Sequence, residues 1–343
     1  MAPVEALAAM LYLIKLFPEI TVKSKPVRRR QTRQVRRNIR SVLITLDPQI
    51  SVLEDWDSIE VETALTDPGT LALIRERLTN LPGISLFMEV EKYPLPADLQ
   101  GILARVLPLY LDRLRGRSFA VRCKRMGEHP FQSTEVESFV GAGLLQHSET
   151  SGVDLENPEV VVAIEVRRQQ LYVVKQQLRG LGGFPLGCQD GVLSLLSGGF
   201  DSAVSSYHSI RRGLQTHYCF FNLGGREHEM AVKEVALFLW LKYHSSHRVK
   251  FITVPFEPVV AEILRRVERS HMAVVLKRMM LRAATRVAQP LEVKVLVTGE
   301  SVAQVASQTL SNLSVIDAVT DALVLRPLIT SDKQEIIDQA RQI

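Results

Sequence analysis

The sequence predicts a multidomain α/β protein whose second half is a doubly wound parallel sheet. Three observations lead to this prediction. From Gly191 onward, strand-like and helix-like segments alternate, which is typical of a parallel sheet with helices on both faces. Before residue 178, strands and helices are mixed in an α+β pattern. A glycine-rich stretch at 180–187 lies between the two parts and has the composition of a linker.

In the first half, hydrophobic periodicity predicts the strands and helices. Strands are expected at 11–17, 58–62, 84–90, 118–125, 159–167 and 170–175. Helices are expected at 27–40, 69–81, 99–114 and 133–148, the last capped by Ser133 or Thr134. Residues 1–10 are taken as an N-terminal extension, with Met10 as an alternative start, because they lack the basic segment and cleavage site of a signal peptide.

In the second half, the same reasoning predicts alternating strands and helices. Strands are expected at 192–196, 217–221, 250–254, 293–298 and 322–325. The two longest helices are expected at 226–242 and 259–287. The strand at 192–196 begins the series, and open α/β sheets bind ligands at the carboxyl ends of such strands.

Composition narrows the class of protein. The chain is 46% hydrophobic and 23% charged, as in an ordinary globular protein. Apolar runs fall short of the about 18–20 residues that a membrane span needs. Three scattered cysteines without a CxxC pair fit a reducing cytoplasm and predict no structural metal. The net charge of +5 permits a polyanionic partner.

The helix expected at 27–40 carries most of the basic charge of the N-terminal region. No acid occurs from Lys23 to Arg40, and one helical face is cationic, which would be costly without a neutralising partner because like charges repel at i,i+4. Phosphates would stabilise such a face, whereas the alternative is a solvated helix surface. The basic residues predicted to contact RNA here are Lys23, Lys25, Arg29, Arg33, Arg36, Arg37 and Arg40.

The loop Ser197-Gly198-Gly199-Phe200-Asp201-Ser202 directly follows the strand at 192–196. Its glycines allow the backbone to approach an anion, and the helix that begins beyond it offers free N–H groups and a positive dipole end. This is not a Walker A loop, because GxxxxGK[ST] is absent. The alternative is an ordinary strand-to-helix turn with a capping aspartate. Its position at the first strand favours a phosphate site.

This loop matches the SGGxDS signature of the PP-loop ATP-pyrophosphatases. Further segments resemble the tRNA 4-thiouridine synthetases in particular. They are Phe17–Ser24 with the basic helix, Arg122–Phe131 with Gly141 and Gly143, Cys219–Gly225 and Val297–Ser301. The resemblance implies a ferredoxin-like domain at 11–67, a THUMP RNA-binding domain at 68–177 and a PP-loop domain, similar to adenine nucleotide alpha hydrolases, at 178–343.

The resemblance also implies a site and its partners. ATP with Mg²⁺ would be bound by Leu195, Leu196, Ser197, Gly198, Gly199, Asp201, Ser202, Lys277, Gly299 and Gln308. Asp201 and Lys333 would act in catalysis, although Lys333 is also explained as a first-turn helix lysine capped by Ser331. Lys124 and Arg125 would contact tRNA. A cysteine desulfurase or persulfide carrier would deliver sulfur, and a homodimer is left open.

In that family a late cysteine and a rhodanese-like domain carry the persulfide. We expect both to lie beyond Ile343, so that adenylation is better supported than completed thiolation or sulfur supply to thiamine synthesis. None of the three cysteines present is expected to substitute. Cys188, in the linker, is the least implausible, because Cys123 and Cys219 lie in apolar strands. The alternatives are another PP-loop tRNA thiolase and a tRNA- and ATP-binding module without turnover.

Overall fold

The computed structural model of the chain describes residues 10–55 and 58–343. Apart from Met10, the predicted N-terminal extension lies outside the described residues. The described residues form two compact units, the first from residues 10–15, 47–55, 58–72 and 86–179, the second from residues 16–46, 73–85 and 180–343. The division into an extension and three domains expected from the sequence therefore stays a prediction.

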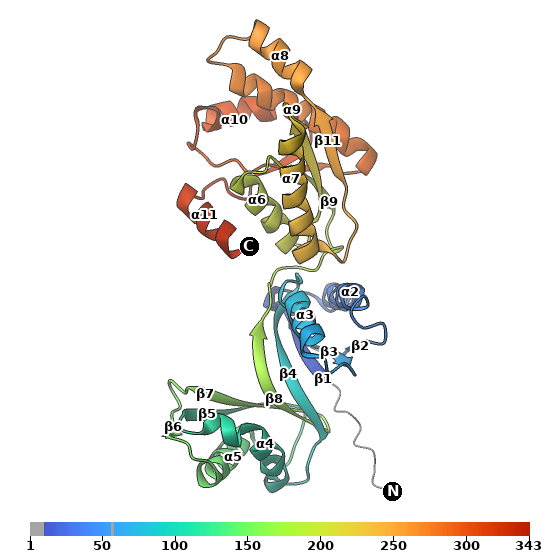
Figure 1. Cartoon of the computed structure of the whole chain (residues 1–343). Helices are drawn as coiled ribbons and strands as arrows, with labels where there is room; N and C mark the ends of the chain where they lie inside the picture. Colours follow the sequence, from blue (N-terminus) through green and yellow to red (C-terminus); the bar gives the residue numbers. More distant parts are fainter. Residues whose placement is uncertain (1–9, 56–57) are drawn as a thin grey trace. The chain divides into compact units, whose positions relative to one another are not determined.

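The first unit is built around an eight-stranded mixed sheet of order β2-β3-β1-β4-β8-β7-β5-β6 (Figure 1). The strands are β1 (Met10–Leu16), β2 (Ser51–Glu54), β3 (Ser58–Thr63), β4 (Ile84–Pro94), β5 (Ser118–Met126), β6 (Gly152–Val153), β7 (Val160–Arg167) and β8 (Gln170–Arg179). β5 pairs in parallel with β6 and with β7. β1 pairs with β3, and β4 with β8, in antiparallel orientation. The short strands β2 and β6 were not predicted, since neither is long enough to show a period.

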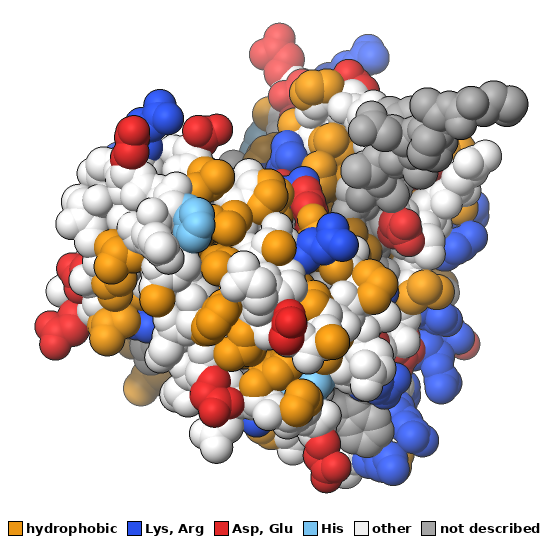
Figure 2. All heavy atoms as spheres, turned by 90° about the horizontal axis from the view of Figure 1, so that it is seen from below, with side chains coloured by type: hydrophobic (Ala, Val, Ile, Leu, Met, Phe, Trp, Pro, Cys, Tyr) orange, Lys and Arg blue, Asp and Glu red, His pale blue; other side chains and the backbone are white. Residues whose placement is uncertain are grey.

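Helices α4 (Leu99–Leu114) and α5 (Ser133–His147) pack on this sheet. Their apolar faces meet strand residues such as Phe119, Val162 and Val173 in one buried cluster. The expected cap of α5 is wrong, because Gln132, not Ser133 or Thr134, accepts the capping hydrogen bond and Glu135 completes the capping box. Both helices also leave apolar side chains exposed, and Figure 2 shows hydrophobic side chains gathered on the face seen from below.

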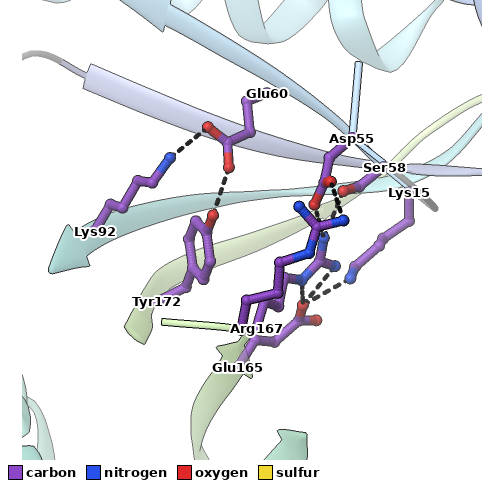
Figure 3. A network of polar contacts seen from close by, with 9 residues as sticks. Lys15, Asp55, Ser58, Glu60, Lys92, Glu165, Arg167 and Tyr172 are labelled. Atoms are coloured by element: carbon purple, nitrogen blue, oxygen red, sulfur yellow. Dashed lines mark hydrogen bonds and ion pairs between the residues drawn. The ribbon is translucent and has the colours of Figure 1, made fainter. Parts of the chain in front are cut away.

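A buried ionic network joins β1, β3 and β7 in the first unit (Figure 3). Lys15 Nζ lies 2.7 Å from Glu165 Oε2, and Arg167 reaches the same carboxylate at 2.7 Å. Burial favours the neutral form of Glu165, but the two cations outweigh it and hold its pKa below the ordinary value. Arg167 also bonds Ser58 of β3. Side chains from three separate strands are thereby tied together.

The second unit contains a five-stranded, all-parallel sheet of order β11-β10-β9-β12-β13, which confirms the predicted fold class. Its strands are β9 (Gly191–Leu195), β10 (Gln215–Asn222), β11 (Phe251–Pro255), β12 (Val295–Val297) and β13 (Leu323–Leu325). Leu193 and Cys219 face a cluster with α9 (Met272–Ala288) and α10 (Leu310–Asp317). Tyr218 and Phe220 face α6 (Phe200–Arg211) and α7 (Arg226–Leu239). Both faces are therefore covered.

The remaining helices of this unit are α1 (Pro18–Thr21), α2 (Lys25–Leu43), α8 (Glu257–Arg266) and α11 (Lys333–Gln342). A π-helical turn at Trp240–His244 continues α7, and α3 (Pro68–Thr79) has residues in both units. The prediction of a single continuous helix at 259–287 is wrong, because α8 ends before Val267 and a separate helix, α9, begins at Met272. Val267 is extended, and Ser270 bonds Glu268 locally, so polar turn contacts replace helix there.

Candidate functional site

The loop Ser197–Ser202 connects β9 to α6 at the centre of the parallel sheet. β10 and β11 extend the sheet on one side of β9, and β12 and β13 extend it on the other. The order in which strands are added to the sheet therefore reverses at β9. Open α/β sheets form their binding crevice at the carboxyl end of the strand where this reversal occurs. Gly198 has a φ of 83°, which a glycine adopts without strain.

The loop is held by its own hydroxyl groups. Ser202 Oγ accepts a hydrogen bond from Ser197 N at 3.1 Å and donates to Gly199 O at 3.0 Å. Gly199 is the N-cap of α6, and among the described residues no side chain caps this end of the helix. The first turn of α6 thus keeps N–H groups for an anion.

Gly299 brings the end of β12 against this turn. A Cβ atom at position 299 would lie 2.6 Å from the carbonyl carbon of Asp201, closer than real Cβ contacts allow. Ser205 Oγ donates to Thr298 O at 2.9 Å and fastens the two segments. The glycine is therefore required by the close approach of α6 to β12.

A cavity of about 310 Å³ opens at this carboxyl edge, within the range of small-ligand sites. It brings together eight of the predicted nucleotide residues, namely Leu195, Leu196, Ser197, Asp201, Ser202, Lys277, Gly299 and Gln308. Gly198 and Gly199 lie in the adjoining loop. Phe220, Phe221, Met280, Leu281 and Ile316 supply apolar walls. An apolar chamber beside an anion-binding loop suits a base attached to phosphates.

Lys277 takes part in a buried network at one wall. Its Nζ lies 2.8 Å from Glu300 Oε1, while Arg326 Nε lies 2.8 Å from Glu300 Oε2. Arg326 also forms a two-pronged ion pair with Asp317. Burial works to raise the pKa of Glu300, but Lys277 and Arg326 overcome it and lower that pKa. The lysine is thereby held in one position beside the cavity.

Lys333 approaches Asp201 from the start of α11. Its Nζ lies 2.9 Å from Asp201 Oδ1 and 3.1 Å from Oδ2. The cap expected for this helix is wrong, since Asp332, not Ser331, accepts the capping bond from Glu335 N. The two residues predicted to act in catalysis are thus in contact.

Several residues that line the cavity had no predicted role, among them the titratable residues Glu300 and His228. Glu300 follows Gly299 at the end of β12, and its position at a strand terminus was a usable signal. His228 lies on α7, and no motif marks it. Gln308 was predicted, but not that its Oε1 is buried and accepts no hydrogen bond from any described residue.

The predicted RNA-contacting residues belong to different units. In the second unit, Lys23 and Lys25 are exposed, and α2 exposes Arg29, Arg33, Arg37 and Arg40 while Arg36 is partly buried. Its opposite face buries Val35 and Ile39. In the first unit, Lys124 of β5 is exposed and Arg125 is partly buried. The α2 face is therefore cationic and open to solvent, as the sequence predicted.

The three thiols are poor nucleophiles in this fold. Burial raises the pKa of Cys219 to about 12, and burial together with Glu137 raises that of Cys123 to about 11. Burial also raises the pKa of Cys188. Each thiol is held in its neutral, less reactive form.

Among residues 10–55 and 58–343, no group of three or more His, Cys, Asp or Glu side chains could hold a metal ion. Mg²⁺ needs fewer protein ligands, because it commonly uses one or two carboxylates together with substrate phosphates. Asp201, at the phosphate loop, is suitably placed for that role. The described helices include none long and apolar enough to span a membrane.

Comparison with known proteins gives the family. The chain is 55% identical over 334 residues to a tRNA sulfurtransferase of Pseudomonas syringae pv. syringae strain B728a, covering 97% of this chain and 69% of the relative. It is 57% identical over the same length and shares to a tRNA sulfurtransferase of Pseudomonas aeruginosa strain UCBPP-PA14. The chain belongs to the tRNA sulfurtransferase family.

Two family models match parts of this tRNA sulfurtransferase family member. The thiamine biosynthesis protein (ThiI) model matches residues 187–343, and the THUMP domain model matches residues 97–174. The crystal structure of a 4-thiouridine synthetase–RNA complex with bound ATP is 27% identical, with a TM-score of 0.83 over 97% of this chain and 84% of that one. PH1313 from Pyrococcus horikoshii Ot3 shares the fold, with 18% identity and a TM-score of 0.74 over 97% and 99% of the two chains.

Proposed function

We propose that this chain uses ATP to adenylate a uracil carbonyl of tRNA, so that sulfur can replace the oxygen. The family membership supports a tRNA sulfurtransferase. The observation that carries the proposal is the single cavity in which the phosphate loop, Lys277 and Asp201 meet at the carboxyl edge of the parallel sheet. The related 4-thiouridine synthetase was solved in complex with RNA and with bound ATP, which supports ATP and an RNA as the ligands of this chain.

In this proposal the C4 oxygen of the uridine at position 8 attacks the α-phosphate of ATP. A bond forms between that oxygen and phosphorus, and the bond to pyrophosphate breaks. The free N–H groups at the start of α6 would hold the departing phosphates, and Lys277 would add positive charge. Lys333 would stabilise charge beside Asp201. AMP is then a good leaving group where a carbonyl oxygen was not.

Asp201 and the phosphates of ATP would be the ligands that hold Mg²⁺ at this site. When bound, it would neutralise charge on the pyrophosphate that leaves. The chain's own residues position the nucleotide around it. Apolar walls would enclose the adenine, and the buried Gln308 Oε1 would accept a hydrogen bond from its amino group.

tRNA would be held by phosphate contacts. In the second unit these would come from Lys23, Lys25 and the exposed arginines of α2, and in the first from Lys124 and Arg125. We further propose that sulfur arrives as a persulfide from a desulfurase or carrier protein, since the three thiols here are held neutral. Three free cysteines fit work in the cytoplasm. The homodimer and the domain boundaries stay predictions.

The test is release of labelled pyrophosphate from ATP in the presence of unmodified tRNA. The wild-type chain should release pyrophosphate only when tRNA is added, and Asp201→Ala should abolish the release. A binding module without turnover would bind both ligands yet release none. Release that does not depend on tRNA would also contradict the proposal.

A further inference from the structure

We propose that His228 is a positioning residue of the phosphate loop, which fixes the direction of the Gly198 N–H group by holding the carbonyl of Ser197. The inference concerns how the site of the proposed function is kept ready for ATP, and it rests on that function.

The contact is a hydrogen bond from α7 to the loop. His228 Nε2 lies 3.1 Å from Ser197 O. A carbonyl oxygen only accepts, so Nε2 must carry the proton and donate it. His228 lies on the same cavity as Ser197, Asp201 and Lys277. The hydrogen bond therefore acts at the loop that would carry the phosphates.

Because the Ser197–Gly198 peptide is planar, the hydrogen bond to Ser197 O also fixes the direction of the Gly198 N–H group. Within one trans peptide, the carbonyl of Ser197 and the N–H of Gly198 point to opposite sides. If the carbonyl is held toward His228, the N–H is directed away from α7. A glycine at 198, with a φ of 83°, leaves this peptide free to rotate with little steric resistance. A flipped peptide would present a carbonyl oxygen to the phosphates and repel them.

The imidazole is itself held in place. Its ring packs edge-on against Phe220, with ring centroids 5.2 Å apart. One helical turn further along α7, Val232 also faces the loop, because a Cβ atom at position 198 would lie 3.0 Å from Val232 Cγ2. His228 and Val232 are four residues apart and share a helical face. α7 therefore contacts the loop through an apolar side chain, Val232, and through a hydrogen-bond donor, His228.

Two substitutions separate the donor from the ring. His228→Gln keeps an N–H donor of similar reach and loses the aromatic ring. His228→Phe keeps the ring against Phe220 and loses the donor. The full chain would be compared with both variants, with thermal unfolding measured in parallel. The readouts are kcat and KM for ATP in tRNA-dependent pyrophosphate release, and binding of a non-hydrolysable ATP analogue.

The proposal predicts that His228→Phe lowers kcat/KM for ATP about tenfold, the effect expected for one lost hydrogen bond. KM for tRNA should not change, and His228→Gln should stay within about twofold of wild type. A role in packing alone predicts the reverse order, with Phe close to wild type and Gln impaired. That order, or wild-type behaviour of both variants, would overturn the proposal.

Binding of the analogue keeps this test separate from the proposed function. If the wild-type chain released no pyrophosphate, the proposed function would fail. The His228 assignment would still be supported if His228→Phe weakened analogue binding about tenfold while His228→Gln did not. Equal affinity of all three proteins for the analogue would overturn the assignment.

Discussion

The ammonium of Lys333 lies 2.9 Å from Asp201 Oδ1 and 3.1 Å from Oδ2, although 132 positions separate the two residues. The contact joins the start of α11 to the first turn of α6. Both side chains are partly exposed, with side-chain exposures of 50% and 30%. An ion pair of this kind adds little to stability. We therefore infer that its value lies in the site and not in the fold.

Replacing the lysine should separate activity from stability. Lys333→Met should reduce tRNA-dependent pyrophosphate release by about 10²–10³-fold, the usual effect of losing a group that stabilises developing charge. The free energy of unfolding should change by less than about 1 kcal/mol. Lys294→Met serves as a control, because this exposed lysine lies just before β12, at the opposite end of the strand from Gly299. Full activity in Lys333→Met would remove it from the catalytic group.

Glu300 should matter for stability as well as for the cavity. Glu300→Gln leaves Lys277 and Arg326 without their shared anion in a largely buried position. We expect the free energy of unfolding to fall by about 3 kcal/mol, as for other broken buried ion pairs. Glu262→Gln is the matched control, since Glu262 also contacts two arginines but is exposed. Equal effects in urea unfolding would show that burial of the Glu300 network contributes nothing.

Gln308 should affect ligand binding and stability in opposite directions. Its Oε1 is buried without a hydrogen-bond partner among the described residues, which costs the ligand-free protein free energy. Gln308→Leu should therefore leave the ligand-free protein at least as stable as wild type. The same change should weaken ATP binding about tenfold by calorimetry, because the adenine amino group would lose its acceptor. Unchanged ATP affinity would place the adenine elsewhere.

His244 should make the protein sensitive to acid. It is fully buried, and burial, together with His247 and His217, lowers its pKa from 6.5 to about 3. Below pH 6.5 His244 is protonated in the unfolded chain but stays neutral in the folded protein. The free energy of unfolding therefore falls as the pH falls toward 3. The expected slope is about 1.4 kcal/mol per pH unit.

Urea unfolding of His244→Leu between pH 7 and pH 5 tests this directly. The variant should lose most of that pH dependence, whatever its stability at neutral pH. His271→Gln, a change at an exposed histidine, should keep the wild-type slope. A slope that survives in His244→Leu would assign the acid sensitivity to other groups.

The parallel sheet and the phosphate loop could be predicted because their signals are local. A few consecutive residues are enough to predict the strand before Ser197 and the turn formed by the glycines after it. The break between α8 and α9 could not be predicted, since Val267 fits a helical pattern and only local turn contacts interrupt it. The strands β2 and β6 were too short to show a period.

The polar contacts within the site could not be predicted from the sequence for a different reason. Lys277, Glu300 and Arg326 come from three separate segments, and no spacing in the sequence shows that they share one carboxylate. His228 likewise gains its role from a backbone carbonyl, and backbone acceptors leave no pattern in a sequence. Contacts of this kind follow from the fold and are visible only once it is known.

The uracil oxygen itself should become bonded to the α-phosphate during adenylation. This step is tested most directly with tRNA that carries ¹⁸O at C4 of the target uridine, incubated with the chain, ATP and sulfide as a simple nucleophile. The released AMP should contain the ¹⁸O, because the oxygen leaves uracil with the phosphate when sulfur attacks C4. AMP without the label, formed while the tRNA keeps its ¹⁸O, would mean that water attacks ATP and that the uracil oxygen is not adenylated.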